Sequence, residues 1–350
     1  MKTRFLLTSM MLLFFTVAVM GQQNNVVVIS KQQKDAEKLY NKAKEKYDAK
    51  SYQAAVTDLQ SAMKIKQDLL EIYPLLAMSE NALGKADDAL KTLDNYAAKL
   101  TGKDSAYRLA ARICYQNGDY NKALTYADKT IALKNGDFEM YYLRGLSNFQ
   151  KADYQAAIAD FSTALGSKKD AWCYNDRAAA YLQANDNKAA IEDYTEAIAI
   201  NPKGQFYNNR GYANMKEQNY AAAIEDFSNA IELNAKDYML FNNRGLAKFH
   251  LKKYADAVED FSQAIALSKD ADYKAYSNRG VANFKLKNYA AAVSDFDNAL
   301  RLNPQFGEGY MHRGNAKEML RQAEDACSDW QKAAQMGVQK AEDYVNNQCK

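Results

Sequence analysis

Alanine recurs at nearly constant spacing along most of this 350-residue chain. Nine alanines are separated by 33 to 35 residues, at Ala55, Ala89, Ala123, Ala157, Ala190, Ala223, Ala257, Ala292 and Ala326. A fixed period of this length indicates an array in which one structural unit is copied and stacked. Each unit of such an array buries apolar surface only against its neighbours. We therefore expect one elongated body that presents an extended surface rather than a deep pocket.

The pattern within one unit is helical. With the alanine at position 20 of a 34-residue unit, nine repeats begin near residues 36, 70, 104, 138, 171, 204, 238, 273 and 307. Position 8 is always glycine or alanine, so that two helices can approach closely there. Apolar residues recur at intervals of three and four, for example from Ala157 to Leu165, which predicts helices. A turn is expected near positions 14 to 16. Six repeats carry a helix-capping residue at position 16, namely Ser51, Asp119, Asp153, Asp186, Asn219 and Asn288.

The full set of recurring positions resembles the tetratricopeptide repeat. Position 4 is aromatic in eight repeats, position 24 is large and apolar in most, and Pro202 and Pro304 stand at position 32. The segment from Tyr207 to Asn234 matches this pattern most clearly. The resemblance implies an all-α fold, an α-solenoid that forms a right-handed superhelix of about nine helix-turn-helix units. It also implies that the first helix of each unit lines a concave groove.

The segments outside the regular repeats have different expected roles. Residues 1–21 are expected to be a signal peptide, since Lys2 and Arg4 precede an uncharged stretch that ends before Gly21. Residues 22–35 are expected to be a flexible linker, 36–137 divergent units 1–3, 138–337 regular units 4–9, and 338–350 a capping helix. An uncleaved membrane anchor is the alternative for the leader, but its apolar stretch is short for a bilayer core.

The leader sets the expected location. Cleavage would leave no integral membrane span and an exported protein, periplasmic or outer-membrane-associated in a Gram-negative bacterium. An exported eukaryotic protein is the alternative. Four cysteines in an exported chain raise the question of a disulfide. Cys327 and Cys349 are the obvious pair in sequence, and two free thiols there are the alternative, while Cys114 and Cys173 lie in separate repeats.

Charge and composition exclude several classes of function. Without Lys2 and Arg4 the chain has 44 basic and 43 acidic residues, and both signs alternate along most helices, so nucleic acid is not an expected partner. The only histidines are His250 and His312, and neither has a cysteine or histidine at ligand spacing. No phosphate-binding GxxxxGK[ST] loop is present. We expect no enzyme activity, no metal and no cofactor.

Arginine at position 7 and aspartate at position 23 occur together in six consecutive repeats. Each pair is separated by 16 residues, and the pairs are Arg144 with Asp160, Arg177 with Asp193, Arg210 with Asp226, Arg244 with Asp260, Arg279 with Asp295, and Arg313 with Asp329. In a helical hairpin with its turn near position 15, these two positions lie at the same height. We predict structural ion pairs within or between repeats.

Asparagines on the first helices form the candidate ligand surface. They occupy position 5 as Asn175, Asn208 and Asn242, and position 6 as Asn209, Asn243 and Asn278. A carboxamide can both donate to and accept from an extended peptide backbone. Trp172 and Tyr212 are candidate aromatic anchors, with packing at a helix start as the alternative.

These features favour a non-enzymatic scaffold that binds a peptide segment or protein in the concave groove. This asparagine row resembles the ladders of some peptide-binding tetratricopeptide proteins. The alternative is a structural or assembly subunit of a cell-envelope or secretion complex that uses the convex face or the ends of the array.

Overall fold

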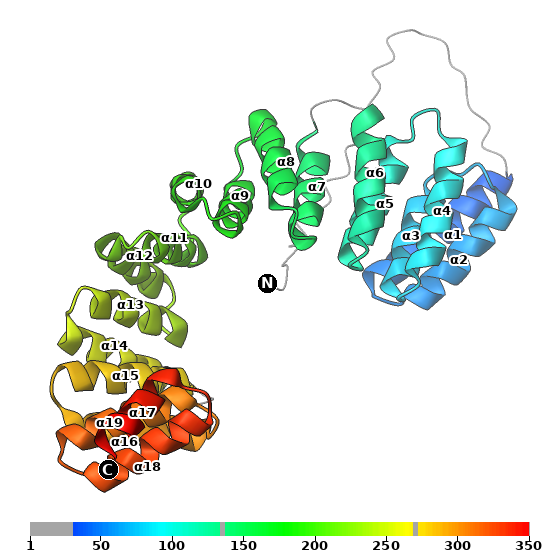
Figure 1. Ribbon diagram of the computed structural model, residues 1–350. Coiled ribbons are helices and arrows are strands. Elements are labelled where there is room, and N and C mark those ends of the chain that lie inside the picture. The colour runs from blue at the N-terminus through cyan, green and yellow to red at the C-terminus, as the bar shows by residue number, and fades with distance from the viewer. Residues whose placement is uncertain (1–30, 134–136, 269–271, 350) are drawn as a thin grey trace. The chain divides into compact units, whose positions relative to one another are not determined.

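A computed structural model describes residues 31–133, 137–268 and 272–349, and all regular structure in these ranges is helical. The predicted signal peptide and residues 22–30 of the predicted linker lie outside the described residues. Figure 1 shows the helices following one another in pairs. In chain order they are α1 (Lys31–Asp48), α2 (Tyr52–Ile65), α3 (Ile72–Ala82), α4 (Ala86–Lys99), α5 (Asp104–Gln116), α6 (Tyr120–Leu133), α7 (Phe138–Gln150), α8 (Tyr154–Ser167), α9 (Ala171–Gln183), α10 (Asn187–Ile200), α11 (Gly204–Lys216), α12 (Tyr220–Leu233), α13 (Tyr238–His250), α14 (Tyr254–Leu267), α15 (Tyr273–Lys285), α16 (Tyr289–Leu302), α17 (Gly307–Met319), α18 (Ala323–Gln335) and α19 (Gln339–Gln348).

The predicted linker is partly wrong, because α1 begins at Lys31 and includes residues 31–35. This first segment, with the sequence KQQKD, is rich in lysine and glutamine, which are good helix formers. The ammonium of Lys66 also donates to Gln33 Oε1 over 3.1 Å. Helix propensity and this contact together extend the helix into the segment expected to be a linker.

Every helix pair is joined by a turn at positions 14 to 16, as the sequence predicts. Three aspartates at position 16 cap the second helix by accepting from a backbone N–H: Asp119, Asp153 and Asp186. The other three expected caps, Ser51, Asn219 and Asn288, make no side-chain capping bond. An ionised carboxylate is a stronger acceptor at a helix N-terminus than a hydroxyl or a carboxamide, which accounts for the difference.

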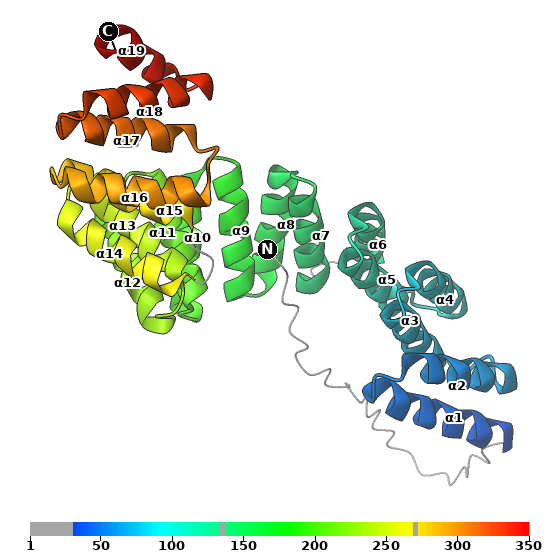
Figure 2. The ribbon, with the colours of Figure 1, turned by 90° about the horizontal axis from the view of Figure 1, so that it is seen from below.

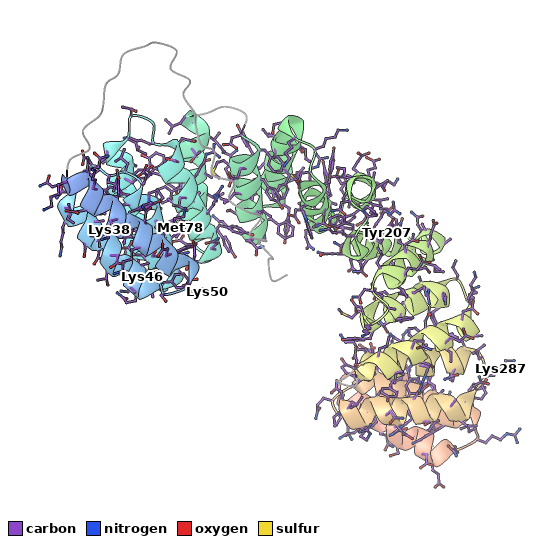
Figure 3. The ribbon with its side chains drawn as sticks, turned by 180° about the vertical axis from the view of Figure 1, so that it is seen from behind. Lys38, Lys46, Lys50, Met78, Tyr207 and Lys287 are labelled. Carbon is purple, nitrogen blue, oxygen red and sulfur yellow. A yellow bond between two sulfur atoms is a disulfide. The ribbon has the colours of Figure 1, made fainter. Side chains whose placement is uncertain are left out.

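Position 15 adopts a left-handed backbone in all nine repeats. Glycine stands there only at Gly84 and Gly118, while seven other repeats place a residue with a side chain at φ between 59° and 63°. Lys50 and Lys287 are two of these residues (Figure 3). A residue with a side chain is disfavoured in this region, so these turns hold local backbone strain that the packing of the two helices must offset.

Contacts divide the chain into two units, one up to Leu83 and one from Gly84 onward. In the first unit, α1, α2 and α3 pack around a core that includes Ala43, Ala55, Leu59 and Leu76. In the second unit each helix from α4 to α19 packs against the next one along the chain. First helices of successive repeats also touch each other, as α11 touches α13 and α13 touches α15. The side made by these first helices is called the first-helix face below.

Position 8 and position 24 pack directly against each other inside a repeat. At Gly145, Gly211, Gly245 and Gly280 an added Cβ would lie 2.6 to 2.9 Å from a ring carbon of the phenylalanine at position 24. Gly314 stands in the same relation to Trp330. In the first and third repeats alanine at position 8 is matched by the smaller Leu59 or Ala127 at position 24. A missing methyl group on one helix therefore makes room for a ring on the other.

Helix α19 covers the last repeat, in agreement with the predicted capping helix. Figure 2 shows it beside α18 at the C-terminal end. The ring of Tyr344 stacks on Trp330 with centroids 5.0 Å apart, and Ala341 is completely buried. Cys327 on α18 is bonded to Cys349 just after α19, with an S–S distance of 2.08 Å. The end of the array is thus closed by apolar packing and by a covalent bond.

Candidate peptide-binding surface

The six arginine–aspartate pairs predicted from the sequence all form, and all lie within a repeat. Each arginine approaches its aspartate with two nitrogens. In the pair of Arg244 and Asp260, Nη2 lies 2.7 Å from Oδ1 and Nε lies 2.9 Å from Oδ2. The shortest distances in the other five pairs, Arg144–Asp160, Arg177–Asp193, Arg210–Asp226, Arg279–Asp295 and Arg313–Asp329, range from 2.5 to 2.7 Å. The aspartates are buried, so these are charge-assisted contacts sheltered from water.

Each of these arginines also reaches the second helix of the preceding repeat. The acceptor stands at position 25 and is a serine or threonine hydroxyl in four cases, as when Arg177 Nη1 donates to Ser162 Oγ over 2.9 Å. In the other two cases it is a carboxylate, as in the 2.6 Å contact of Arg144 with Asp128. One side chain therefore joins three helices and fixes the spacing between neighbouring repeats.

A second donor supports the buried aspartate from position 11. Asn148 and Asn214 each donate to their aspartate over 2.9 Å, and Lys248 does so over 2.7 Å. The sequence analysis did not predict that positions 11 and 25 contact the ion pair. Two recurring features of the sequence indicate them: an asparagine or lysine four residues after the arginine in most of these repeats, and a short polar residue two residues after the aspartate.

The candidate asparagines pair with each other across repeats. The carboxamide at position 6 of one repeat donates to the carboxamide oxygen at position 5 of the repeat before it. Asn209 donates to Asn175 over 2.9 Å, Asn243 to Asn208 over 3.4 Å, and Asn278 to Asn242 over 3.0 Å. We call these six residues the asparagine ladder. Its members come from four first helices, α9, α11, α13 and α15.

The pairing leaves hydrogen-bonding capacity on the ladder. A carboxamide has two N–H donors and an oxygen that can accept twice. In the pair of Asn208 and Asn243, the only bond among the described residues uses one N–H of Asn243 and the oxygen of Asn208. The amide of Asn208 and the oxygen of Asn243 are then left for a ligand. One donor and one acceptor in a fixed orientation match what one residue of an extended backbone offers.

The first ladder residue is an exception. Asn175 is only 1% exposed, and its amide donates to Asp176 Oδ1 over 3.0 Å. Asp176 in turn accepts from the Tyr142 hydroxyl over 2.6 Å. Burial raises the pKa of Asp176 to about 6, against the opposing effect of these two hydrogen bonds. Asn175 therefore orients Asn209 and is not itself available to a ligand, in contrast to its predicted role.

The two candidate aromatic anchors have different environments. Trp172 packs edge-on against Phe206 of the next repeat, with ring centroids 5.0 Å apart, and the Lys203 ammonium lies 4.6 Å from its ring centre. It is therefore a packing residue between α9 and α11. Tyr212 on α11 is 50% exposed, and the Lys216 ammonium lies 5.6 Å from its ring centre. Tyr212 remains a candidate contact for a ligand.

The remaining cysteines and the histidines take no part in the ladder. Cys114 and Cys173 are buried free thiols, and burial raises the pKa of both. His250 stacks on Tyr220 with centroids 4.7 Å apart. Among the described residues no three histidine, cysteine or acidic side chains are grouped so as to hold a metal ion. Within the same ranges, no helix combines the length and the apolar character needed to cross a membrane.

Comparison with known proteins agrees with this architecture. A tetratricopeptide repeat family model matches residues 75–138, 115–171, 175–238 and 209–273, and a second matches residues 273–306. No curated protein matches the chain.

Among solved structures, the C-terminal part of a TPR repeat-containing protein from Cytophaga hutchinsonii is 18% identical. The match covers 68% of this chain and 98% of that one, with a TM-score of 0.59. YrrB, described as a TPR protein with an unusual peptide-binding site, is 18% identical over 52% of this chain and 94% of its own, with a TM-score of 0.48. MamA from Desulfovibrio magneticus RS-1 is 21% identical over 47% and 94%, with a TM-score of 0.45.

The family models together span more than half of the chain. This chain belongs to the tetratricopeptide repeat family.

Proposed function

We propose that this chain binds an extended peptide segment of a partner protein along the first-helix face of repeats 5 to 8, the concave groove of the array. Tetratricopeptide repeats form scaffolds for protein interaction, and the ladder supports this particular use of the scaffold. Its carboxamides are held by one another, so that they offer donors and acceptors in fixed orientations at intervals of one repeat. Preorganised polar groups bind without the cost of ordering mobile side chains.

The nature of the ladder also defines the type of ligand. A carboxamide pairs with backbone N–H and C=O groups whatever the side chains beside them. The ladder would therefore hold an extended backbone in register, as in other modes of recognition that use main-chain hydrogen bonds. Selection among sequences would fall to side chains that flank the ladder, among them the half-exposed ring of Tyr212.

Replacing Asn209, Asn243 and Asn278 together by alanine tests this function. We expect capture of partners from a native extract to be lost while helicity by circular dichroism is unchanged. The matched control replaces Asn229 and Asn298, which lie on the second helices α12 and α16. Unchanged capture by the ladder variant, or equal loss in the control, would count against the proposal.

An assembly role is a second candidate, and exposed apolar side chains at the ends of second helices favour it. Ile200 and Leu233 end α10 and α12 in successive repeats and are 46% and 57% exposed. Under this alternative, the array would be a subunit of an envelope or secretion complex. Replacing both by serine would then release the chain from its complex, whereas the ladder variant would not.

We also propose that the chain works outside the cytoplasm, in the periplasm or at the outer membrane. Structural disulfides persist in oxidising compartments, and the bond between Cys327 and Cys349 supports such a location. Thiol labelling of denatured protein taken from native cells without reductant tests this. We expect two reactive thiols, Cys114 and Cys173. Four reactive thiols would contradict the bond and the location together.

A further inference from the structure

A cavity opens on the first-helix face between repeats 8 and 9, one repeat beyond the last ladder pair. Its volume is about 170 Å³, and it is lined by Val281, Phe284, Lys285, Phe296, His312 and Asn315. These residues come from α15, α16 and α17. A cavity of about 150 Å³ with apolar walls is large enough to bind benzene. The space thus fits one aromatic or branched apolar side chain.

The ladder stops where this cavity begins. In repeats 6, 7 and 8 position 6 is an asparagine that donates to position 5 of the preceding repeat. In repeat 9 position 6 is His312, whose ring stacks on Phe296 with centroids 5.7 Å apart. In repeat 9 the imidazole ring of His312 thus takes the place of the carboxamide and lines the cavity. A backbone that follows the ladder would reach the cavity at the next equivalent position.

The rim of the cavity carries donors. Asn315 Oδ1 accepts from Trp330 Nε1 over 2.9 Å, which leaves its amide hydrogens for another acceptor. Burial lowers the pKa of His312, and the nearby Lys285 and Lys340 lower it further while Glu308 opposes them. Lys285 is exposed and pairs with no carboxylate in the part of the chain that the structure describes. Of these charged residues, Lys285 is the one that also lines the cavity.

We infer that this cavity receives an aromatic or branched apolar side chain of the bound segment, with an acidic group of the same segment placed beside Lys285. The inference rests on the proposed function and adds to it the kind of sequence that is selected. Apolar contact with Val281, Phe284 and Phe296 favours the side chain. The unpaired ammonium of Lys285 favours an acidic neighbour and disfavours a basic one.

The probe for this inference is 3-phenylpropionate, which carries a phenyl ring and one carboxylate. Its binding is followed by ligand-observed NMR titration and compared with that of 3-phenylpropylamine and of propionate. We expect the acid to bind more tightly than the amine, and propionate not to bind. Val281→Phe, which fills the cavity, is expected to abolish binding of the probe. Lys285→Glu is expected to raise its Kd about tenfold, or about 1.4 kcal/mol.

Matched controls stand at the same positions in earlier repeats. Leu246→Phe alters position 9 of repeat 7, and Lys216→Glu alters position 13 of repeat 6. Both are expected to bind the probe as the unaltered chain does. Lys285 lies on the exposed rim, so its substitution tests the charge requirement without disturbing the core.

Three results would overturn the inference: no binding of the probe, equal binding by Val281→Phe, or binding of the amine as tight as that of the acid. The outcomes separate the two proposals, because the ladder variant keeps the cavity intact. If that variant loses its partners while the probe fails to bind, only the cavity assignment is wrong. If the probe binds as expected while the ladder variant keeps its partners, the use of the ladder is wrong instead.

Discussion

Gly245 lies so close to the ring of Phe261 that a Cβ on the glycine would be 2.7 Å from Cε1. Both residues belong to repeat 7, one on each helix of the hairpin, and Phe261 is completely buried. Since the neighbouring atoms form part of the core, neither residue can move far without opening a gap elsewhere. The distance between the two helices of the repeat is therefore set by this pair.

Gly245→Ala is expected to destabilise the array by about 1–3 kcal/mol through overpacking. Phe261→Leu alone should also destabilise it by leaving a cavity. Combined, the two changes recreate the alanine–leucine pairing of the first repeat, where Ala43 and Leu59 share one core, so their effects should not add. Thermal denaturation of both single variants and the double variant measures the coupling, and strict additivity would contradict direct contact.

Asp160 and Asp128 both bind the guanidinium of Arg144, but they differ in exposure. The Asp160 side chain is 6% exposed and that of Asp128 is 60% exposed. Asp160→Ala leaves a partly buried charge without its main partner and is expected to cost about 3 kcal/mol. Asp128→Ala should cost less than about 1 kcal/mol, as for exposed pairs. Equal losses of stability in denaturation experiments would argue against a buried structural role for the pair of Arg144 and Asp160.

Lys287 holds a left-handed backbone at the turn between α15 and α16, with φ of 63°. Glycine adopts this region without steric cost, so Lys287→Gly is expected to stabilise repeat 8 by up to about 1 kcal/mol. The reverse change, Gly118→Ala at the same position in repeat 3, should be destabilising. Chemical denaturation that shows the opposite signs would mean that the lysine side chain contributes more than the backbone strain costs.

The stability near Asp176 is expected to depend on pH. Its pKa in the folded chain is about 6, above the ordinary value of 3.8. Between these values the folded state binds more protons than the unfolded state, so this group makes stability fall as pH rises from about 4 to 6. Asp176→Asn should therefore stabilise the protein at pH 7, by about 1–3 kcal/mol, and have little effect near pH 4. An equal gain in thermal stability at both pH values would contradict the assignment of this effect to the titration of Asp176.

The repeating helical architecture could be predicted from the sequence because the same pattern of residues recurs in each repeat. The turn at positions 14 to 16 and the constant separation of arginine and aspartate follow from the geometry of a helical hairpin, which local spacing describes. The contacts between repeats are harder to predict. That Asn243 donates to Asn208, or that Asn175 is buried beneath Asn209, depends on how far one repeat is rotated against the next. No local pattern specifies this rotation.

The left-handed turns could not be predicted from the sequence, for a different reason. Nothing in the chemistry of Lys50 or Lys287 marks a residue with positive φ, because lysine is common in ordinary helices. The only sign is Gly84 and Gly118 at the same position in other repeats. Packing of two long apolar helix faces overrides the preference of one residue in the turn. In a repeat protein, comparison between units is thus more informative than the residue itself.

Photo-crosslinking tests most directly whether the first-helix face binds the partner. Benzoylphenylalanine is placed at Tyr212, on the first-helix face, or at Leu233, at the end of the second helix of the same repeat. These side chains are 50% and 57% exposed, so the two sites are equally accessible. We predict crosslinks from position 212 that map by mass spectrometry to one extended segment of a partner and vanish when the ladder asparagines are replaced by alanine. Crosslinks from position 233 alone would contradict groove binding.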